Sequence, residues 1–472
     1  MRTISSLLPL LIVAILIGCS SSAEVIVVDS TGGLGEESAQ QTPPATTTTA
    51  PPKSDFVKVT IGEHDTIHSL DPLFAQNAAE LRAVHLIYDG LTTINENNLV
   101  QPAIASSWEV SSDSLNYTFT LRPDAFFHNN TAFSSGKGRL VVAEDILQIF
   151  KRMGSLNAPT HIAERFYAIK GYPSYHHEQL SVKNPKLQAI TEIEGISIEN
   201  DSTISFQLTQ KDADFLSKLA HPNASIYPIE SVSKEEVLLD SPIGTGAFYM
   251  AQKMEDKIIL AANKDYFGNT NELSRIDIVH GKTESSLYQE FAKGTVDAII
   301  APSPSTLATV SDITGDINPV FKNVFSLEKT DALTVVNIFY NPNSQRNELH
   351  DLMTQTRVIS SDAVTDFTIQ TAPSIADSIL GNEQILFAYT DSPFELHLLN
   401  RLASTLNEHA AVVLGSTYAV WDETVFSTKY FSGAKTSLTW NAPTYILQHK
   451  SITGIDLGPY NWAISFDSFS RN

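Results

Sequence analysis

The sequence predicts an α/β protein of two or more lobes, preceded by a secretory leader and a flexible linker. Three observations carry this prediction. The 472-residue chain is longer than one hydrophobic core usually serves. Strand-like and helix-like stretches alternate along it, which is typical of mixed sheets covered by helices. Its one cysteine stands at position 19, so the body has to be stabilised by packing and hydrogen bonds rather than by disulfides.

The first element is a short apolar run from Leu7 to Ile17. This run includes a proline and is too short to span about 30 Å of hydrocarbon at roughly 1.5 Å per residue. Together with Met1-Arg2 and the small residue before Cys19, it indicates a signal peptide over residues 1–18. The sequence Leu16-Ile17-Gly18-Cys19 resembles the lipobox of bacterial lipoproteins, which implies that Cys19 carries lipid such as palmitate and anchors the protein to a membrane. The alternative, a buried free thiol, would leave the position of a lone cysteine unexplained.

Residues 19–54 form the next segment, which is rich in Thr, Pro and Ser. Such a composition offers too few apolar groups to offset the entropy lost on ordering, so we expect a disordered linker. A flexible chain of this length reaches roughly 30 Å, so the body can stand off a membrane surface. The formal charge of −22 comes with no basic stripe, which argues against a nucleic-acid partner.

The folded body begins with a strand and a helix. Phe56–Ile61 alternates apolar and polar residues, as a half-buried strand does. Asn77–Tyr88 carries apolar residues at helical spacing, and Asp89-Gly90 ends that helix. The sequence therefore starts its core with a strand that leads into an amphipathic helix.

The same alternation continues along the chain. Tyr117–Arg122 reads as a strand, and residues 142–153 place one apolar stripe on a helix that ends at Gly154. The stretches 195–200 and 202–208 predict a hairpin. From Thr283 an N-cap, a helix, a stop at Gly294 and the strand 296–300 form an αβ unit suited to a mixed sheet. Gly244 and Gly246 are expected at positions where the backbone passes so close to another segment of the protein that a side chain would collide.

Six blocks, in order from Ser69 to Ile300, resemble the oligopeptide- and dipeptide-binding proteins of ABC transporters, the solute-binding family 5. They read "SLDPLFAQNAAELRAVHLIYDGL", "QPAIASSWEVSSDSLNYTFTLRPDAFFHNNTAF", "VVAEDILQIFKRM", "LAHPNASIYPIE", "SPIGTGAFYMAQKMEDKIILAANKDYFGN" and "KGTVDAII". The resemblance implies a two-lobed, periplasmic-binding-protein-like fold of type II, with mixed sheets and a hinge between lobes. It also implies an extracytoplasmic, membrane-anchored location, on the periplasmic side or at the cell surface.

The resemblance also divides the chain. Lobe I is expected over 55–93, 195–302 and 450–472, and a subdomain of lobe I over 94–194. Lobe II is expected over 303–449. The match thins beyond Lys329, and we find no Tyr-Asp…Trp…Asp stretch of the kind that binds a peptide's amino terminus. The prediction is therefore a shortened second lobe.

The candidate ligand-binding residues come from the same resemblance. The loop after Leu70-Asp71-Pro72, two later blocks, the Asn turn and the return segment line the family's cleft. In this sequence they supply Phe74, Gln76, Asn77, His221, Asn223, Thr245, Gly246, Phe248, Tyr340, Asn341, Tyr460 and Trp462. Each of these residues could instead serve packing, because an aromatic near a cleft is more often part of a core.

Other chemistry is less favoured. His176-His177-Glu178 could hold a metal, but adjacent residues point apart, and Pro173 suggests a surface loop, so we expect no metal site and no cofactor. No Gly-x-Ser-x-Gly elbow, HExxH pair or P-loop is present. Because nothing nominates a nucleophile with a base beside it, we expect a protein that is not an enzyme.

The leading hypothesis is an extracytoplasmic solute-binding lipoprotein that captures a small solute, in first place a peptide, for import. Its expected partners are the ligand and the permease and ATPase subunits of an ABC transporter, and the protein itself is expected to be a monomer. The alternative is a binding-deficient member of the family that acts as an interaction protein at the membrane surface.

Overall fold

The computed structural model describes residues 56–233, 236–269, 272–312, 315–340, 356–360, 367–370, 384–389, 393–406, 411–416, 426–427 and 435–471. The predicted signal peptide, Cys19, the linker up to residue 54 and Asn341 lie outside the described residues.

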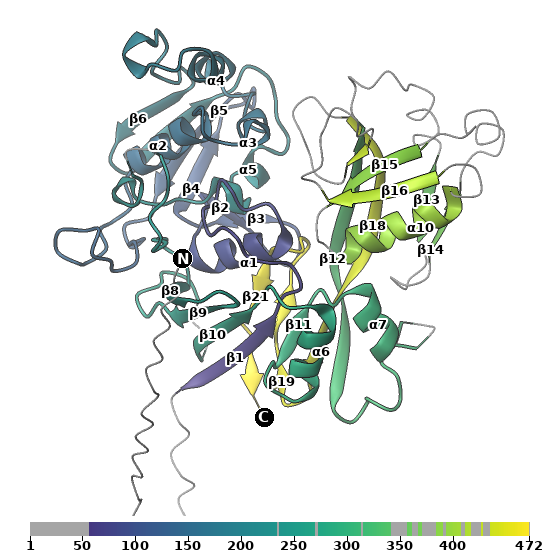
Figure 1. Cartoon of the computed structure of the whole chain (residues 1–472). Helices are drawn as coiled ribbons and strands as arrows, with labels where there is room; N and C mark the ends of the chain where they lie inside the picture. Colours follow the sequence, from purple (N-terminus) through teal and green to yellow (C-terminus); the bar gives the residue numbers. More distant parts are fainter. Residues whose placement is uncertain are drawn as a thin grey trace, which may run out of the picture. The chain divides into compact units, whose positions relative to one another are not determined.

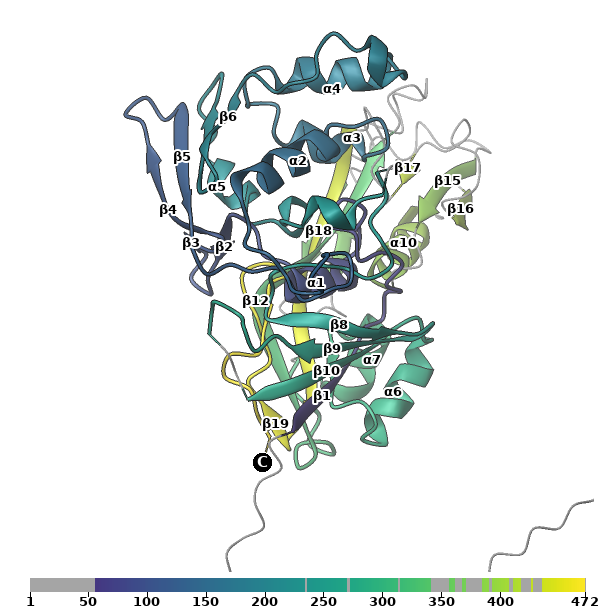
Figure 2. The same cartoon turned by 90° about the vertical axis from the view of Figure 1, so that its left-hand side faces the viewer.

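A ten-stranded mixed sheet runs through the body in the order β16-β15-β17-β12-β18-β11-β1-β10-β9-β8 (Figure 1). β1 (Val57–Gly62) is parallel to both of its neighbours, β10 (Leu273–Val279) and β11 (Ala298–Ile300). β9 (Lys257–Ala262) and β8 (Phe248–Lys253) continue the sheet as antiparallel strands (Figure 2). The predicted first strand is thereby confirmed.

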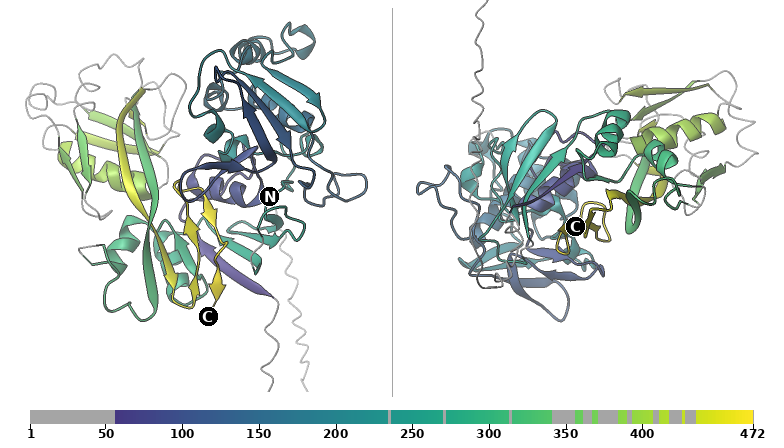
Figure 3. Two further views of the ribbon diagram at one scale, coloured as in Figure 1. Left: turned by 180° about the vertical axis from the view of Figure 1, so that it is seen from behind. Right: turned by 90° about the horizontal axis from the view of Figure 1, so that it is seen from below.

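Two long strands extend this sheet beyond β11. β12 (Phe325–Tyr340) pairs antiparallel with β18 (Lys435–His449), and the register is interrupted between Lys329 and Leu333. Figure 3 shows the two strands side by side from behind. The remaining strands and the helix of this part are β13 (Arg357–Ser360), β14 (Phe367–Gln370), β15 (Gln384–Tyr389), α10 (Pro393–Leu406), β16 (Ala411–Ser416) and β17 (Phe426–Ser427).

A second sheet has four antiparallel strands in the order β4-β5-β7-β6. They are β4 (Ala105–Val110), β5 (Asn116–Leu121), β6 (Ile196–Asn200) and β7 (Thr203–Gln207), while β2 (Thr92–Ile94) pairs separately with β3 (Val100–Pro102). α2 (Ala143–Met153) buries its apolar stripe against this sheet, where Phe150 meets Phe206 with ring centroids 5.2 Å apart. The predicted hairpin and helix are both confirmed.

α1 (Ala78–Ile87) is capped as its sequence specifies. The Asn77 side chain accepts the Glu80 backbone N–H, and the Glu80 carboxylate accepts that of Asn77, which is a complete capping box. At the other end of α1, a Cβ on Gly244 or Gly246 would overlap the backbone of Ile87. The expectation that these glycines allow a close backbone approach is confirmed.

The predicted αβ unit also forms. Thr283 caps α6 (Glu284–Ala292), Gly294 adopts a φ of 75°, and β11 follows. α7 (Pro304–Val310) comes next. The chain ends with β19 (Ile452–Thr453), β20 (Asp456–Leu457), β21 (Ile464–Ser465) and β22 (Ser470–Arg471), in which β19 pairs with β22 and β20 with β21.

Short helices fill the segment between α2 and β8. They are α3 (Thr160–Glu164), α4 (Tyr172–Ser181), α5 (Phe215–Lys218) and the 3-10 turns Pro185–Leu187, Pro222–Ala224 and Ile229–Ser231. The interpretation of residues 173–178 as a surface loop is wrong, because they belong to α4. Pro173 is tolerated in its first turn, where no intrahelical N–H is needed, and His176 is fully buried beside the Tyr167 hydroxyl, 2.7 Å from Nδ1. None of the helices in the described ranges combines the length and the apolarity that crossing a membrane requires.

Candidate functional site

The loop between β1 and α1 carries three of the predicted site residues, and Glu80 determines its path. One oxygen of this buried carboxylate accepts the N–H groups of His68 and Ser69 at 2.9 and 3.1 Å. The other accepts those of Gln76 and Asn77 at 2.7 and 3.3 Å. A buried carboxylate that receives four backbone donors holds the loop in one conformation.

Within that loop the three predicted residues have different surroundings. The Asn77 amide donates to the Thr66 carbonyl oxygen at 2.9 Å, so its polar atoms are engaged in the fold. Gln76 is exposed, and Phe74 is half-buried with the Arg152 guanidinium 5.9 Å from its ring centroid. Of the three predicted residues, Gln76 is therefore the most open to solvent, and the Phe74 side chain is partly open.

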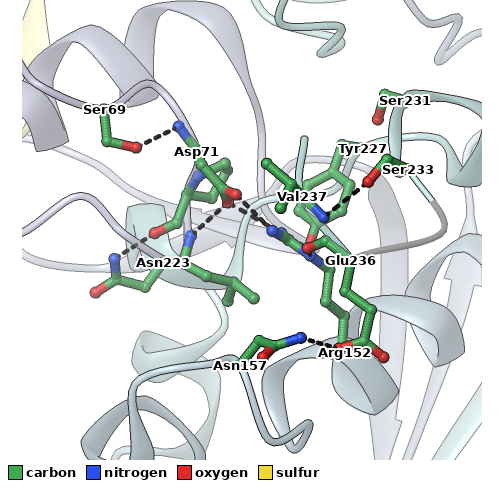
Figure 4. Close-up of polar contacts among 12 residues, drawn as sticks. Ser69, Asp71, Arg152, Asn157, Asn223, Tyr227, Ser231, Ser233, Glu236 and Val237 are labelled. Carbon is green, nitrogen blue, oxygen red and sulfur yellow. Dashed lines mark hydrogen bonds and ion pairs between the residues drawn. The ribbon is translucent and has the colours of Figure 1, made fainter. Parts of the chain in front are cut away.

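Asn223 and Arg152 tie the same loop to the rest of the body. The Asn223 amide is buried and donates to the carbonyl oxygens of Pro72 and Ala75 at 2.5 and 3.1 Å. Arg152 points from α2 to Asp71 and forms two parallel hydrogen bonds of 2.9 and 2.5 Å with its carboxylate (Figure 4). These contacts position the loop. The role of Asn223 in a solute site is therefore indirect, because its amide holds the loop in place.

His221 and Arg165 meet beside Asn223. Nη1 of Arg165 lies 3.3 Å from Nδ1 of His221 and 3.3 Å from Oδ1 of Asn223. Nδ1 of His221 also accepts the backbone N–H of Asn223 at 3.2 Å, which starts the 3-10 turn Pro222–Ala224. Because Nδ1 accepts from both groups, the His221 imidazole carries its proton on the other nitrogen and is neutral.

Trp462 brings the end of the chain to this group. Its ring packs edge-on against those of His221 and His85, with centroids 5.6 and 5.5 Å apart, and is only 5% exposed. Tyr460 stacks on Trp462 with centroids 5.3 Å apart and an angle of 14° between the rings. Tyr460 is 38% exposed, and its backbone forms a β-bridge with Leu333 of β12, so one exposed aromatic ring lies where the C-terminal segment meets the long strand pair.

A buried ion pair holds this aromatic segment in place. Arg82 of α1 binds Glu63 through Nε and Nη2 at 2.8 and 2.5 Å, and both side chains are almost completely buried. Nη1 of Arg82 donates to the carbonyl oxygen of Asn461 at 2.5 Å. The residue between Tyr460 and Trp462 is thus fixed to α1 by a charge-assisted hydrogen bond.

In this group the Arg165 guanidinium is charged, whereas the imidazole rings of His221 and His85 are neutral. Burial, and then the neighbouring Arg165, lower the pKa of His221 to about 3, and burial alone lowers the pKa of His85 to about 4. Both rings are enclosed by other groups although each keeps part of its surface exposed. Burial also lowers the pKa of Arg165, which nevertheless stays protonated at neutral pH.

Thr245, Gly246 and Phe248 lie at the other end of α1. The Thr245 hydroxyl is buried and donates to Asp89 at 2.7 Å, and the Gly246 carbonyl oxygen accepts from the Asn263 amide at 3.1 Å. Phe248 is buried in the core at 3% exposure. Burial raises the pKa of Asp89 to about 6, although hydrogen bonds from Thr245 and Tyr266 oppose this shift. The contact of these three residues with a solute stays a prediction.

The remaining predicted residues cannot be placed in this group. Tyr340 is the last residue of β12, where its backbone pairs with Phe426 and Lys435, and Asn341 and Cys19 are outside the described residues. The structure therefore unites His221, Asn223, Tyr460 and Trp462, and links the loop of Phe74 and Gln76 to them through Asn223.

A cavity of about 270 Å³ has Arg152 among its lining residues. It is lined by α2 and the turn Ile229–Ser231, with Lys151, Tyr175, Tyr227 and Glu236 among its walls. The two tyrosine hydroxyls and the Lys151 ammonium already bond within the protein. None of the predicted site residues lines this cavity.

Comparison with known sequences identifies the family. The sequence model of the bacterial extracellular solute-binding proteins, family 5, matches residues 100–358, which is more than half of the chain. The chain belongs to this family. The identification confirms the resemblance seen in the ordered blocks.

Two curated relatives match parts of the chain. Heme-binding protein A of Haemophilus influenzae is 30% identical over 47% of this chain and 39% of its own length. The dipeptide-binding protein of Escherichia coli is 25% identical over 68% of this chain and 57% of its own length. This chain thus spans roughly half, or less, of the length of these curated relatives.

Solved structures agree on the fold. The periplasmic binding protein DppA from Helicobacter pylori, an ABC-transporter-associated protein solved with the peptide STSA, superposes with a TM-score of 0.64. It covers 87% of this chain and 98% of its own at 14% sequence identity, which shows the fold alone. The described residues have the mixed α/β fold of the two-lobed periplasmic binding proteins, as predicted.

Sequence reasoning missed four residues of this candidate site: Glu63, Arg82, His85 and Arg165. Arg82 and His85 stand within the predicted helix, where the helical spacing alone gives neither a role in a site. Arg165 meets His221 across 56 positions of sequence, and Arg82 meets Asn461 across 379. No local pattern encodes contacts over such distances, so no sequence signal could have grouped them.

Proposed function

We propose that this chain is the extracytoplasmic solute-binding lipoprotein of an ABC transporter and that it captures a small solute, in first place a peptide, for import. The match to family 5 over residues 100–358 carries the proposal. The Tyr460–Trp462 stack supports it, because an exposed ring fixed by a buried ion pair offers a preformed surface for a solute. Phe74, Gln76, His221, Tyr460 and Trp462 are the contacts that we propose.

A thermal-unfolding screen tests capture. The full chain is purified in detergent and melted with a panel of dipeptides, tripeptides and free amino acids. A solute at 100 times its Kd adds about 2.7 kcal/mol to the free energy of unfolding, which raises Tm measurably. Absence of a Tm shift with every peptide, and with concentrated cell extract, would contradict the proposal.

The membrane anchor has a test of its own. Cys19→Ser removes the thiol to which lipid would attach, so the variant should leave the membrane fraction while the wild type stays there. Cys19→Ser that still sediments with membranes would refute the anchor and leave solute capture untouched. Recovery of permease and ATPase subunits with the wild-type protein, after solubilisation of membranes, would support the transporter.

A second candidate is a binding-deficient member that serves as an interaction protein at the membrane surface. The end of the family match at residue 358 favours it, because the predicted second lobe lies mostly beyond that point. It predicts no Tm shift with any solute, and recovery of membrane proteins that include no permease or ATPase.

A further inference from the structure

Arg165 differs in its partners from six other arginines of the described residues. Six arginines in the described ranges form ion pairs with carboxylates at 2.5–2.7 Å: Arg82, Arg122, Arg139, Arg152, Arg275 and Arg471. Arg165 pairs with no carboxylate of the described residues. The contrast is informative because the chain has 53 acidic against 31 basic residues, so carboxylates are in excess.

The hydrogen bonds of Arg165 leave donors free. Nη1 contacts His221 and Asn223, both neutral, at 3.3 Å, which is long for bonds from a guanidinium. Nε and Nη2 donate to no atom of the described residues. An arginine carries five N–H donors in a rigid fork that matches a carboxylate, and three of these donors are unused here.

The surroundings of Arg165 make an unpaired cation costly. The side chain is half-buried, and burial lowers its pKa. The groups that face it are also uncharged: His221 is neutral, and burial and Arg165 lower the pKa of His161. A half-buried charge without a partner loses part of its solvation free energy, and an opposite charge beside it offsets that loss.

We propose that Arg165 is the anchor for a carboxylate of the captured solute, which it binds through Nε and Nη2. This inference rests on the proposed function and names the class of solute, namely molecules with a carboxylate. His221 separates Arg165 from Trp462, so the anion binds one ring away from the aromatic stack. The carboxylate can come from the C-terminus of a peptide or from an acidic side chain, and the probes below distinguish them.

The first experiment uses calorimetric titration of the full chain in detergent. The probes are Ala-Phe, its amide Ala-Phe-NH2, which lacks the carboxylate, and Glu-Phe-NH2, which carries it on the side chain. The variants are Arg165→Gln and Arg165→Lys. The matched control is Arg122→Gln, because Arg122 is also half-buried but is paired with Asp124.

We expect the carboxylate probe that the wild type binds best to bind Arg165→Gln roughly 10- to 100-fold more weakly, because a charge-assisted hydrogen-bond pair is lost. Arg165→Lys should recover part of this affinity, and Arg122→Gln should match the wild type. Ala-Phe-NH2, which has no carboxylate, should bind the wild type and Arg165→Gln equally. Equal affinity of Arg165→Gln and wild type for the carboxylate probes overturns the inference, while capture itself still stands.

A second experiment covers the case in which no peptide binds or Arg165→Gln fails to fold. Benzoate, with benzamide as its neutral control, is titrated into the wild type while the arginine Nε–H signals are followed by NMR. The Arg165 signal is identified as the one missing in Arg165→Lys. A shift of that signal with benzoate but not with benzamide supports the anion site even if peptide capture fails, and an unmoved signal overturns it.

Discussion

Removal of the Arg82 guanidinium is expected to destabilise the protein more than any exposed charge change. The ion pair with Glu63 is 3% and 2% exposed at its two side chains. Arg82→Met keeps most of the apolar stem but leaves Glu63 as a buried carboxylate without its two hydrogen bonds. Breaking a buried pair in this way costs about 3–5 kcal/mol. The Asn461 carbonyl oxygen loses its donor as well, which loosens the Tyr460–Trp462 segment.

The measurement is urea unfolding, followed by tryptophan fluorescence and circular dichroism in parallel. Arg122→Met is the control, since its partly exposed pair with Asp124 should contribute about 1 kcal/mol or less. The double variant Glu63→Leu/Arg82→Met removes both charges and should recover a large part of the loss. An Arg82→Met protein within about 1 kcal/mol of the wild type would refute the reasoning, as would a double variant no more stable than the single one.

Four further outcomes follow from the structure. Burial lowers the pKa of four histidines to about 3 to 4: His64, His85, His128 and His221. Between about pH 6.5 and 4 these histidines bind protons in the unfolded chain but stay neutral in the folded chain. Acid therefore lowers the free energy of unfolding over this range. Asp89, with its pKa raised to about 6, has the opposite effect between about pH 6 and 4, so Asp89→Asn should steepen the acid loss in urea titrations at stepped pH; a shallower loss would contradict this. Gly244→Ala should cost about 2–3 kcal/mol through overlap with Ile87, whereas Gly458→Ala, whose Cβ would lie 3.3 Å from that of Ala463, should cost much less, and equal melting of the two would be incompatible with the close approach. Tyr460→Ala should change stability by less than about 1 kcal/mol yet weaken solute binding in the Tm screen, and unchanged binding would remove Tyr460 from the site.

The local elements were predictable because their signals lie within a few residues. Asn77 and Glu80 stand three apart and form the capping box that starts α1, and the stripe of α2 faces the second sheet. α4 escaped prediction because it lacks a clear apolar stripe and has Pro173 in its first turn. The 16-residue length of β12 was not predicted either, since its pairing with β18 depends on residues about 100 positions away.

Only those residues of the candidate site were predictable from the sequence whose type and matched block already suggested a place near a cleft. Tyr460 and Trp462 were found as aromatics in a matched block, but what makes them a surface is the hold of Arg82 on the residue between them. Arg165 carries no signal in sequence, because an arginine in an acidic chain is normally paired, as six others here are. Arg165 is distinguished by its neighbours, because the neutral side chains of His221 and Asn223 lie where other arginines have carboxylates. Only the folded structure shows this, since the sequence does not tell which residues lie beside Arg165. A binding group of this kind is defined by the absence of an opposite charge beside it in the fold, so it has to be sought among unpaired charges rather than among sequence motifs.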